Sequence, residues 1–150
     1  MDTNHNSPLA KALDHSQTAE HLFYGALPLA KDPKLLPGIV KSISNSLELV
    51  LEQLLITEKM AVPEGLLKKI NAARPFIKKY HLSNEDVTFM LRIHEILYQQ
   101  KQSPVEFRRG DRHIICSADY DLEIVSAQDV EGFLQHTKKI LHSLKSPKKG

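Results

Sequence analysis

The sequence predicts a mainly α-helical fold: an up-and-down bundle of about five helices, with a small β-hairpin or three-strand meander at about residues 105–125, before the last helix. Apolar residues recur every three or four positions over most of the chain, which is the period of an amphipathic helix. After about residue 104 that period gives way to short runs rich in β-branched residues, which indicate strands.

The longest helical pattern runs from Pro37 to Lys59, and no glycine or proline interrupts it between Ile39 and Met60. Its apolar residues form one broad band about six turns long, which needs partner helices, so we expect this helix to organise the core. The band consists of Leu36, Ile39, Val40, Ile43, Leu47, Val50, Leu51, Leu54 and Leu55.

Two further apolar residues of this helix, Leu49 and Ile56, lie a heptad apart on its opposite side. On so central a helix we expect them to meet another helix, either of the same chain or of a second subunit. We predict a homodimer with this helix near the interface, and Leu49 and Ile56 are the candidate interface residues.

Residues 1–15 are mostly polar and are expected to be loosely ordered, while residues 146–150 form a basic tail. A single helical domain is therefore predicted for residues 16–145. Its first helix should begin near Ser16, with a kink or break caused by Gly25 and Pro28. The short connection Lys31-Asp32-Pro33 predicts that the first two helices are antiparallel neighbours.

A third helix is predicted from about Leu66 to Tyr80, and Pro75 should bend or split it. Its inward residues are expected to be Leu67, Ile70, Ala73, either Phe76 or Ile77, and Tyr80. Its exposed side carries Lys68, Lys69, Arg74, Lys78 and Lys79.

A fourth helix should follow Ser83, an N-cap residue with acidic residues after it, and run to about Gln100. Its inward side is predicted to comprise Val87, Met90, Leu91, His94, Leu97 and Tyr98. Another N-cap signature at Ser126–Asp129 starts the final helix, which ends at about Leu144. The inward residues of that helix are Val130, Phe133, Leu134, Thr137, Ile140, Leu141 and Leu144.

The predicted hairpin turns at Gly110-Asp111, because two residues containing glycine suit a tight turn between strands. Leu122–Val125 is a candidate third strand. The hairpin register pairs Arg109 with Arg112, Arg108 with His113, Phe107 with Ile114 and Val105 with Cys116.

Composition excludes several classes of protein. The chain has 150 residues, a formal net charge of +2 and a single cysteine, Cys116, so no internal disulfide can form. No apolar run approaches the roughly 20 residues that span a bilayer, and residues 1–15 do not resemble a targeting peptide. We expect a soluble cytoplasmic protein without a membrane partner.

No motif for a metal or cofactor is present. The eight histidines are scattered without a CxxC or HExxH arrangement, and the six glycines form neither a P-loop nor GxGxxG. We therefore predict no metal, no cofactor and no catalytic residue of these classes. Cys116 follows two isoleucines, which favours a buried small side chain over a reactive thiolate.

The most distinctive local feature is the basic turn, where Arg108, Arg109, Arg112 and His113 surround Gly110. Arginines in a rigid turn can bind phosphate with two hydrogen bonds each, so these four residues are the candidate anion- or nucleic-acid-binding site. The alternative is a solvated hairpin tip whose charges discourage pairing of strand edges.

The stretch SQTAEHLFYGALPLAKDPKLLPGIVKSISNSLELVLEQLL, within residues 16–60, resembles the start of HEPN-type domains. The resemblance implies two long antiparallel helices joined by a short loop, and dimer formation. Many members are ribonucleases with an arginine followed some residues later by a histidine, or partners of a small nucleotidyltransferase. Arg108 and His113 have that spacing here, but in a predicted hairpin rather than a helix.

We therefore predict a non-catalytic helical binding module, dimeric, that engages a protein or a nucleic acid such as RNA through its hairpin. The resemblance leaves two alternatives. One is a metal-independent ribonuclease in which Arg108 stabilises a phosphate and His113 acts as acid or base. The other is a regulatory partner subunit of a nucleotidyltransferase.

Overall fold

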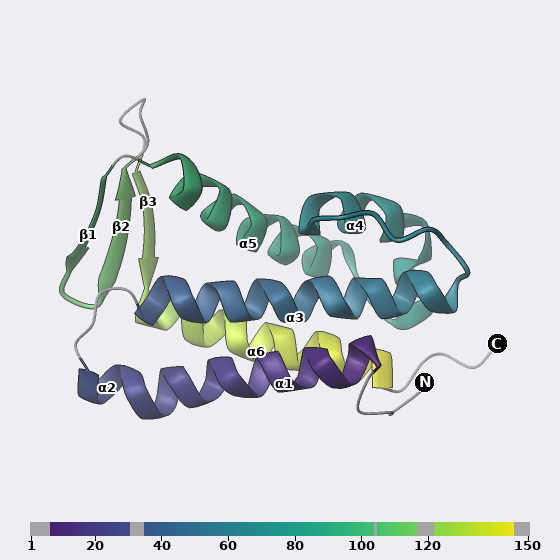
Figure 1. Cartoon of the computed structure of the whole chain (residues 1–150), viewed down its shortest axis with the longest axis horizontal. Coiled ribbons are helices and arrows are strands. Elements are labelled where there is room, and N and C mark those ends of the chain that lie inside the picture. Colours follow the sequence, from purple (N-terminus) through teal and green to yellow (C-terminus); the bar gives the residue numbers. More distant parts are fainter. Residues whose placement is uncertain (1–6, 31–34, 104, 117–121, 146–150) are drawn as a thin grey trace.

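The computed structural model describes residues 7–30, 35–103, 105–116 and 122–145. The predicted fold class is confirmed: helices pack side by side, and a three-strand antiparallel sheet precedes the last helix (Figure 1). The predicted connection at Lys31–Pro33 and the basic tail lie outside the described residues. None of the described helices is long and apolar enough to span a membrane.

Helix α1 (Pro8–His21) starts earlier than the predicted Ser16, so that prediction was wrong. Ser7 caps it by accepting a hydrogen bond from the backbone N–H of Ala10 at 3.1 Å, and Pro8 occupies the first turn, where its missing N–H costs nothing. Leu9 and Ala12 are buried, so the first two turns are anchored in the core.

The predicted irregularity near Gly25 and Pro28 is confirmed. A π-helical turn, η1 (Leu22–Ala26), separates α1 from α2 (Leu27–Ala30). Pro28 has no N–H to bond the carbonyl of Tyr24. The N–H of Leu27 bonds the carbonyl of Leu22, which lies five residues earlier, and this widens the turn.

Helix α3 (Leu35–Thr57) organises the core, as predicted. Every residue of its apolar band is buried, with no more than 6% of the surface exposed. Helix α1 runs antiparallel along it (Figure 1). The hydroxyl of Ser46 donates to the carbonyl of Ala12 at 2.7 Å, and both residues are fully buried, so small side chains let the two helices approach closely.

Pro75 splits the third helical pattern, as predicted, into α4 (Leu66–Ala73) and a 3₁₀ segment, η2 (Arg74–Tyr80). The predicted inward side was wrong at its start, because Leu67 is 39% exposed while Leu66 is buried. Lys69 is also buried rather than exposed, and it pairs with Glu48 at 3.3 Å. The buried residues of the two segments are Leu66, Lys69, Ile70, Ala73, Ile77 and Tyr80.

Helix α5 (Asn84–Gln102) begins with the predicted cap, a reciprocal pair of hydrogen bonds between Ser83 and Asp86. Its predicted inward side is only partly correct. Tyr98 is 50% exposed and His94 is half-buried, whereas Phe89, Ile93 and Ile96 are buried. The reason is that α5 packs against α3, α4, α6 (Ala127–Lys145) and the sheet, so its buried arc is rotated from the one that periodicity favours.

The sheet stands at one end of the bundle, at the left of Figure 1, in the order β1-β2-β3. Its strands are β1 (Val105–Arg109), β2 (Arg112–Cys116) and β3 (Leu122–Ser126). The predicted hairpin register is confirmed at all four pairs. Gly110 takes a φ of 64°, which is the left-handed region that favours glycine in a tight turn.

Helix α6 follows β3 without an intervening loop. The side chain of Ser126 accepts from the N–H of Asp129, and the Asp129 carboxylate accepts from the N–H of Ser126, so the predicted cap is confirmed. Phe133 is half-buried and packs on the core. The other inward residues are buried as predicted: Val130, Leu134, Thr137, Ile140, Leu141 and Leu144.

Candidate functional site

The residues of the predicted basic turn separate onto the two faces of the sheet. Successive side chains of a strand point to opposite faces, so Arg112 and His113 cannot share one. Arg112 is exposed and lies opposite Arg109, which is also exposed. These two arginines are therefore the part of the predicted site that the fold brings together.

His113 is buried, with 5% of its surface exposed, so its predicted place on an exposed turn was wrong. It faces the helices, and its Nε2 lies 3.0 Å from Oε1 of Glu106. The other ring nitrogen, Nδ1, is buried and has no hydrogen-bond partner among the described residues. Arg108 lies opposite His113 in the register, and only its backbone is described.

The outer face of the sheet, which we define as the side away from the helices, carries exposed apolar side chains. Phe107, Ile114 and Ile124 form one row across the three strands, in which Ile114 of the middle strand is buried. Phe107 is 45% and Ile124 is 40% exposed, and Leu122 in the next row is 58% exposed. The sequence analysis missed this face, because Leu122, Ile124 and Val125 are all apolar and give no alternation that tells the exposed side of β3 from the buried one.

Hydrogen bonds and an ion pair connect the sheet to the helices that precede and follow it. The carbonyl of Asp111, at the turn, accepts a hydrogen bond from the N–H of Ala127 at 3.1 Å. The hydroxyl of Ser103, just after α5, donates to the carbonyl of Cys116 at 2.5 Å. Arg92 of α5 forms an ion pair with Glu123 of β3. The outer face is therefore carried by a sheet with fixed neighbours.

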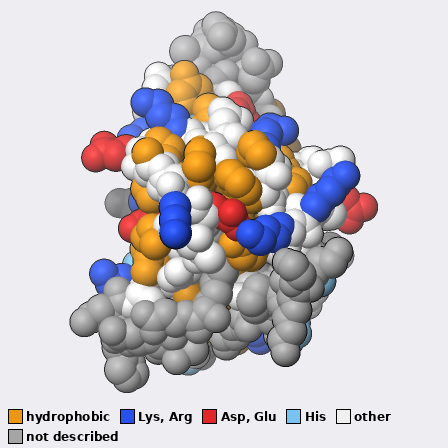
Figure 2. Space-filling view, turned by 90° about the vertical axis from the view of Figure 1, so that its right-hand side faces the viewer, with side chains coloured by type: hydrophobic (Ala, Val, Ile, Leu, Met, Phe, Trp, Pro, Cys, Tyr) orange, Lys and Arg blue, Asp and Glu red, His pale blue; other side chains and the backbone are white. Residues whose placement is uncertain are grey.

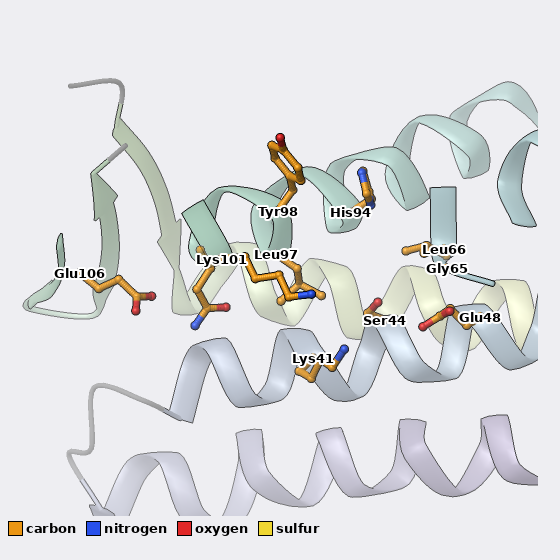
Figure 3. A pocket seen from close by; sticks show the side chains of 11 residues that line it. Lys41, Ser44, Glu48, Gly65, Leu66, His94, Leu97, Tyr98, Lys101 and Glu106 are labelled. Atoms are coloured by element: carbon orange, nitrogen blue, oxygen red, sulfur yellow. The ribbon is translucent and has the colours of Figure 1, made fainter. Parts of the chain in front are cut away.

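A groove of about 550 Å³ runs between α3 and α5 on the helix side of the sheet (Figure 3). Lys41, Ser44 and Glu48 of α3 form one wall, and α5 forms the other. The rings of His94 and Tyr98 lie 6.1 Å apart on the α5 wall. Glu106 of β1 lines the end nearest the sheet.

A carboxylate–histidine pair joins α5 to α6, in which Asp86 is buried and His136 is half-buried. Oδ1 of Asp86 lies 2.6 Å from Nε2 of His136, whose ring stacks on Phe89 at 4.2 Å. Burial works to raise the pKa of Asp86, but the hydrogen bonds from Ser83 and His136 outweigh it and hold that pKa below its usual value. Asp86 lies between Ser83 and His136, so the histidine is not placed to activate the hydroxyl as a nucleophile would require.

The described residues offer no site for a metal. No group of three or more histidine, cysteine, aspartate or glutamate side chains among them is placed to hold an ion. Cys116 is half-buried at the end of β2.

The two predicted interface residues of α3 have different surroundings. Leu49 is half-buried and packs on the core of its own chain. Ile56 is 48% exposed, and Met60, one turn later, is 45% exposed. Figure 2 faces the end of the molecule where α3 terminates, and apolar side chains gather there among lysine and arginine side chains.

Lys79 and Tyr80 both bind Glu58, and these bonds hold the pKa of Glu58 below its usual value.

Comparison of the chain with protein-family models, with curated proteins and with solved structures finds no match.

Proposed function

We propose that the chain is a non-catalytic binding module that holds single-stranded nucleic acid, such as RNA, on the outer face of its sheet. The observation that carries the proposal is the pair Arg109 and Arg112, exposed opposite each other beside the exposed ring of Phe107. The single cysteine suits a cytoplasmic setting for this activity.

Charge supports this assignment. Like charges directly opposite on neighbouring strands destabilise a sheet, and neither arginine has an ion-pair partner among the described residues. A phosphate between the two guanidinium groups would remove that repulsion, because each can donate two parallel hydrogen bonds to it.

The apolar rows supply the second kind of contact. Phe107 lies in the row next to Arg109 and Arg112, so a base could stack on its ring while the neighbouring phosphate meets the arginines. Stacking on aromatic side chains beside a positive track is how proteins hold single strands without reading a sequence. Ile124 and Leu122 extend the platform for a second nucleotide.

Fluorescence anisotropy with a labelled single-stranded RNA tests the proposal. The variant Arg109→Gln/Arg112→Gln is expected to lose about tenfold or more in affinity and to lower the slope of log K against log salt by about two. Phe107→Ala should weaken binding by about 1–3 kcal/mol with the salt slope unchanged.

The matched control is Lys68→Gln/Lys139→Gln, which removes the same charge from exposed positions on α4 and α6. This control should bind RNA nearly as the parent chain does. Negligible binding at low salt, or equal weakening in both double variants, would contradict the proposal.

A protein partner is the second candidate, and the exposure of the aliphatic Leu122 and Ile124 favours it. It predicts a different ranking of variants. Leu122→Ser/Ile124→Ser would then abolish partner binding while the arginine variant mainly slows association.

The ribonuclease alternative drawn from the HEPN resemblance gains no support. His113 is buried against Glu106, which does not favour an acid or base that must meet RNA. We expect RNA to stay intact throughout the titration, and cleavage that Arg108→Ala abolishes would favour the ribonuclease.

The homodimer stays a proposal, with Ile56 and Met60 as its exposed apolar contacts. Ile56→Glu/Met60→Glu is expected to convert a dimer to a monomer in light scattering after gel filtration, because both side chains would place a charge in the interface. The control Lys59→Glu lies between them and keeps both apolar residues. A dimer that survives the double variant would exclude this end of α3 as the interface.

A further inference from the structure

The groove between α3 and α5 is a second candidate site, separate from the outer face of the sheet. We infer that it binds a small phosphate monoester that carries an apolar or aromatic group. Its volume of about 550 Å³ falls within the range of ligand pockets in proteins. The inference depends on three features of the groove: two lysine ammonium groups without an ion-pair partner among the described residues, a buried imidazole in its lining, and the mixture of polar and apolar side chains around it.

The groove holds two lysines that pair with no carboxylate among the described residues. Of its two carboxylates, Glu48 is paired with Lys69 at 3.3 Å, and Glu106 lies 3.0 Å from Nε2 of His113, an imidazole that offsets the carboxylate charge only when it is protonated. Lys41 and Lys101, both exposed, have no ion-pair partner among the described residues. Figure 3 shows their ammonium groups pointing from opposite walls into the same space.

Two converging ammonium groups match a phosphate monoester better than a carboxylate. A phosphate monoester carries about −1.5 to −2 charges at neutral pH, so it can offset both lysines. A carboxylate carries one charge and would leave their repulsion half compensated. Ser44 and Gln100 also line this space and offer polar hydrogen-bonding groups.

The groove continues toward the sheet into a lobe of about 390 Å³, which Gly38, Gln100 and His113 line. His113 is buried, and its Nδ1 atom has no hydrogen-bond partner among the described residues. Buried polar atoms in proteins nearly always have a partner, so this imidazole is a polar group of the lobe's lining whose hydrogen bonding is incomplete.

The remaining lining suits an organic substituent. Leu66 and Leu97 provide apolar surface, and the rings of Tyr98 and His94 form an aromatic wall. If the phosphate is held between Lys41 and Lys101, the organic group of the ester would therefore contact these apolar and aromatic side chains.

Phenyl phosphate is the probe, followed by NMR chemical shifts of the Ser44 amide and the Leu97 methyl groups. Saturable shifts are expected, with weaker binding of inorganic phosphate, which lacks the ring, and of benzoate, which lacks the second charge. Lys41→Gln/Lys101→Gln should weaken phenyl phosphate at least tenfold. Both lysines are exposed, so the variant is expected to fold, and an unchanged thermal unfolding curve checks this.

Two further variants assign the site. Lys68→Gln/Lys139→Gln should leave phenyl phosphate binding unchanged, and so should Arg109→Gln/Arg112→Gln, which tests the separate nucleic-acid surface. The inference would be overturned if the shifts were confined to the hairpin or if Ser44 and Leu97 showed no saturable shift. It would also be overturned if all three double variants lost phenyl phosphate affinity equally. Benzoate binding as tightly as phenyl phosphate would overturn the assignment of a phosphate.

Discussion

Replacing Leu54 with alanine is expected to lower the free energy of unfolding by about 2–5 kcal/mol. Leu54 is fully buried in α3, the helix that α1, α4, α5 and α6 all contact. Its loss would remove apolar burial and leave a cavity in a close-packed core. Urea unfolding followed by circular dichroism at 222 nm measures the change, with the slope m expected to stay constant.

The control is Leu67→Ala, which removes the same atoms from a side chain that is 39% exposed. Its cost should stay below about 1 kcal/mol, because an exposed position leaves no cavity. If both variants lost the same unfolding free energy, Leu67 would have to be packed as deeply as Leu54. That result would contradict the observed orientation of α4.

Asp86→Ala is expected to cost about 2–4 kcal/mol, the second large effect. The variant removes the Asp86 half of the reciprocal cap of α5, worth about 0.5–1 kcal/mol, while Ser83 still caps the helix, and it leaves His136 without its buried partner at about 1–3 kcal/mol. The carboxylate accepts from the N–H of Ser83 at 2.8 Å and pairs with His136 at 2.6 Å. Chemical unfolding at pH 7 checks this value.

The same residue gives a pH dependence of known sign. Because the pKa of Asp86 is lower in the folded chain than in the unfolded chain, its contribution is fully present above the unfolded pKa, about 4. It is lost as the pH falls through the folded value. The difference in unfolding free energy between the parent chain and Asp86→Ala should therefore shrink below about pH 4.

Asp129→Ala supplies the matched control, because Asp129 makes the same reciprocal cap at α6 but is exposed and has no histidine partner among the described residues. It should cost about 0.5–1 kcal/mol, because Ser126 still caps the helix and only the Asp129 half of the pair is lost. A loss at Asp129 as large as that at Asp86 would mean that His136 adds nothing.

Local patterns predicted the parts of the fold that depend on sequence neighbours. The buried side of α3 was predicted in full, because its nine apolar residues lie in one stripe and can be buried together in only one orientation of the helix. The hairpin register followed from a two-residue turn at Gly110. The caps at Ser83 and Ser126 were predicted because a short polar side chain can reach the N–H groups of its own helix.

Features that depend on distant neighbours were missed. Leu66 and Leu67 are adjacent and equally apolar, so only the contacts of α4 decide which one is buried. Lys69 is buried because Glu48, in another helix, accepts its charge. His113 became part of the interior because Glu106 lies within reach across the hairpin, and no one-dimensional pattern records that contact.

The direct passage from β3 into α6 has a consequence for the order in which the chain folds. Helix α6 packs on both α1 and α3 and buries Leu134, Ile140 and Leu144 against them. During synthesis, α3 therefore remains without part of its cover until residues 127–145 have been made. The complete core can therefore close only after this last helix has been synthesised.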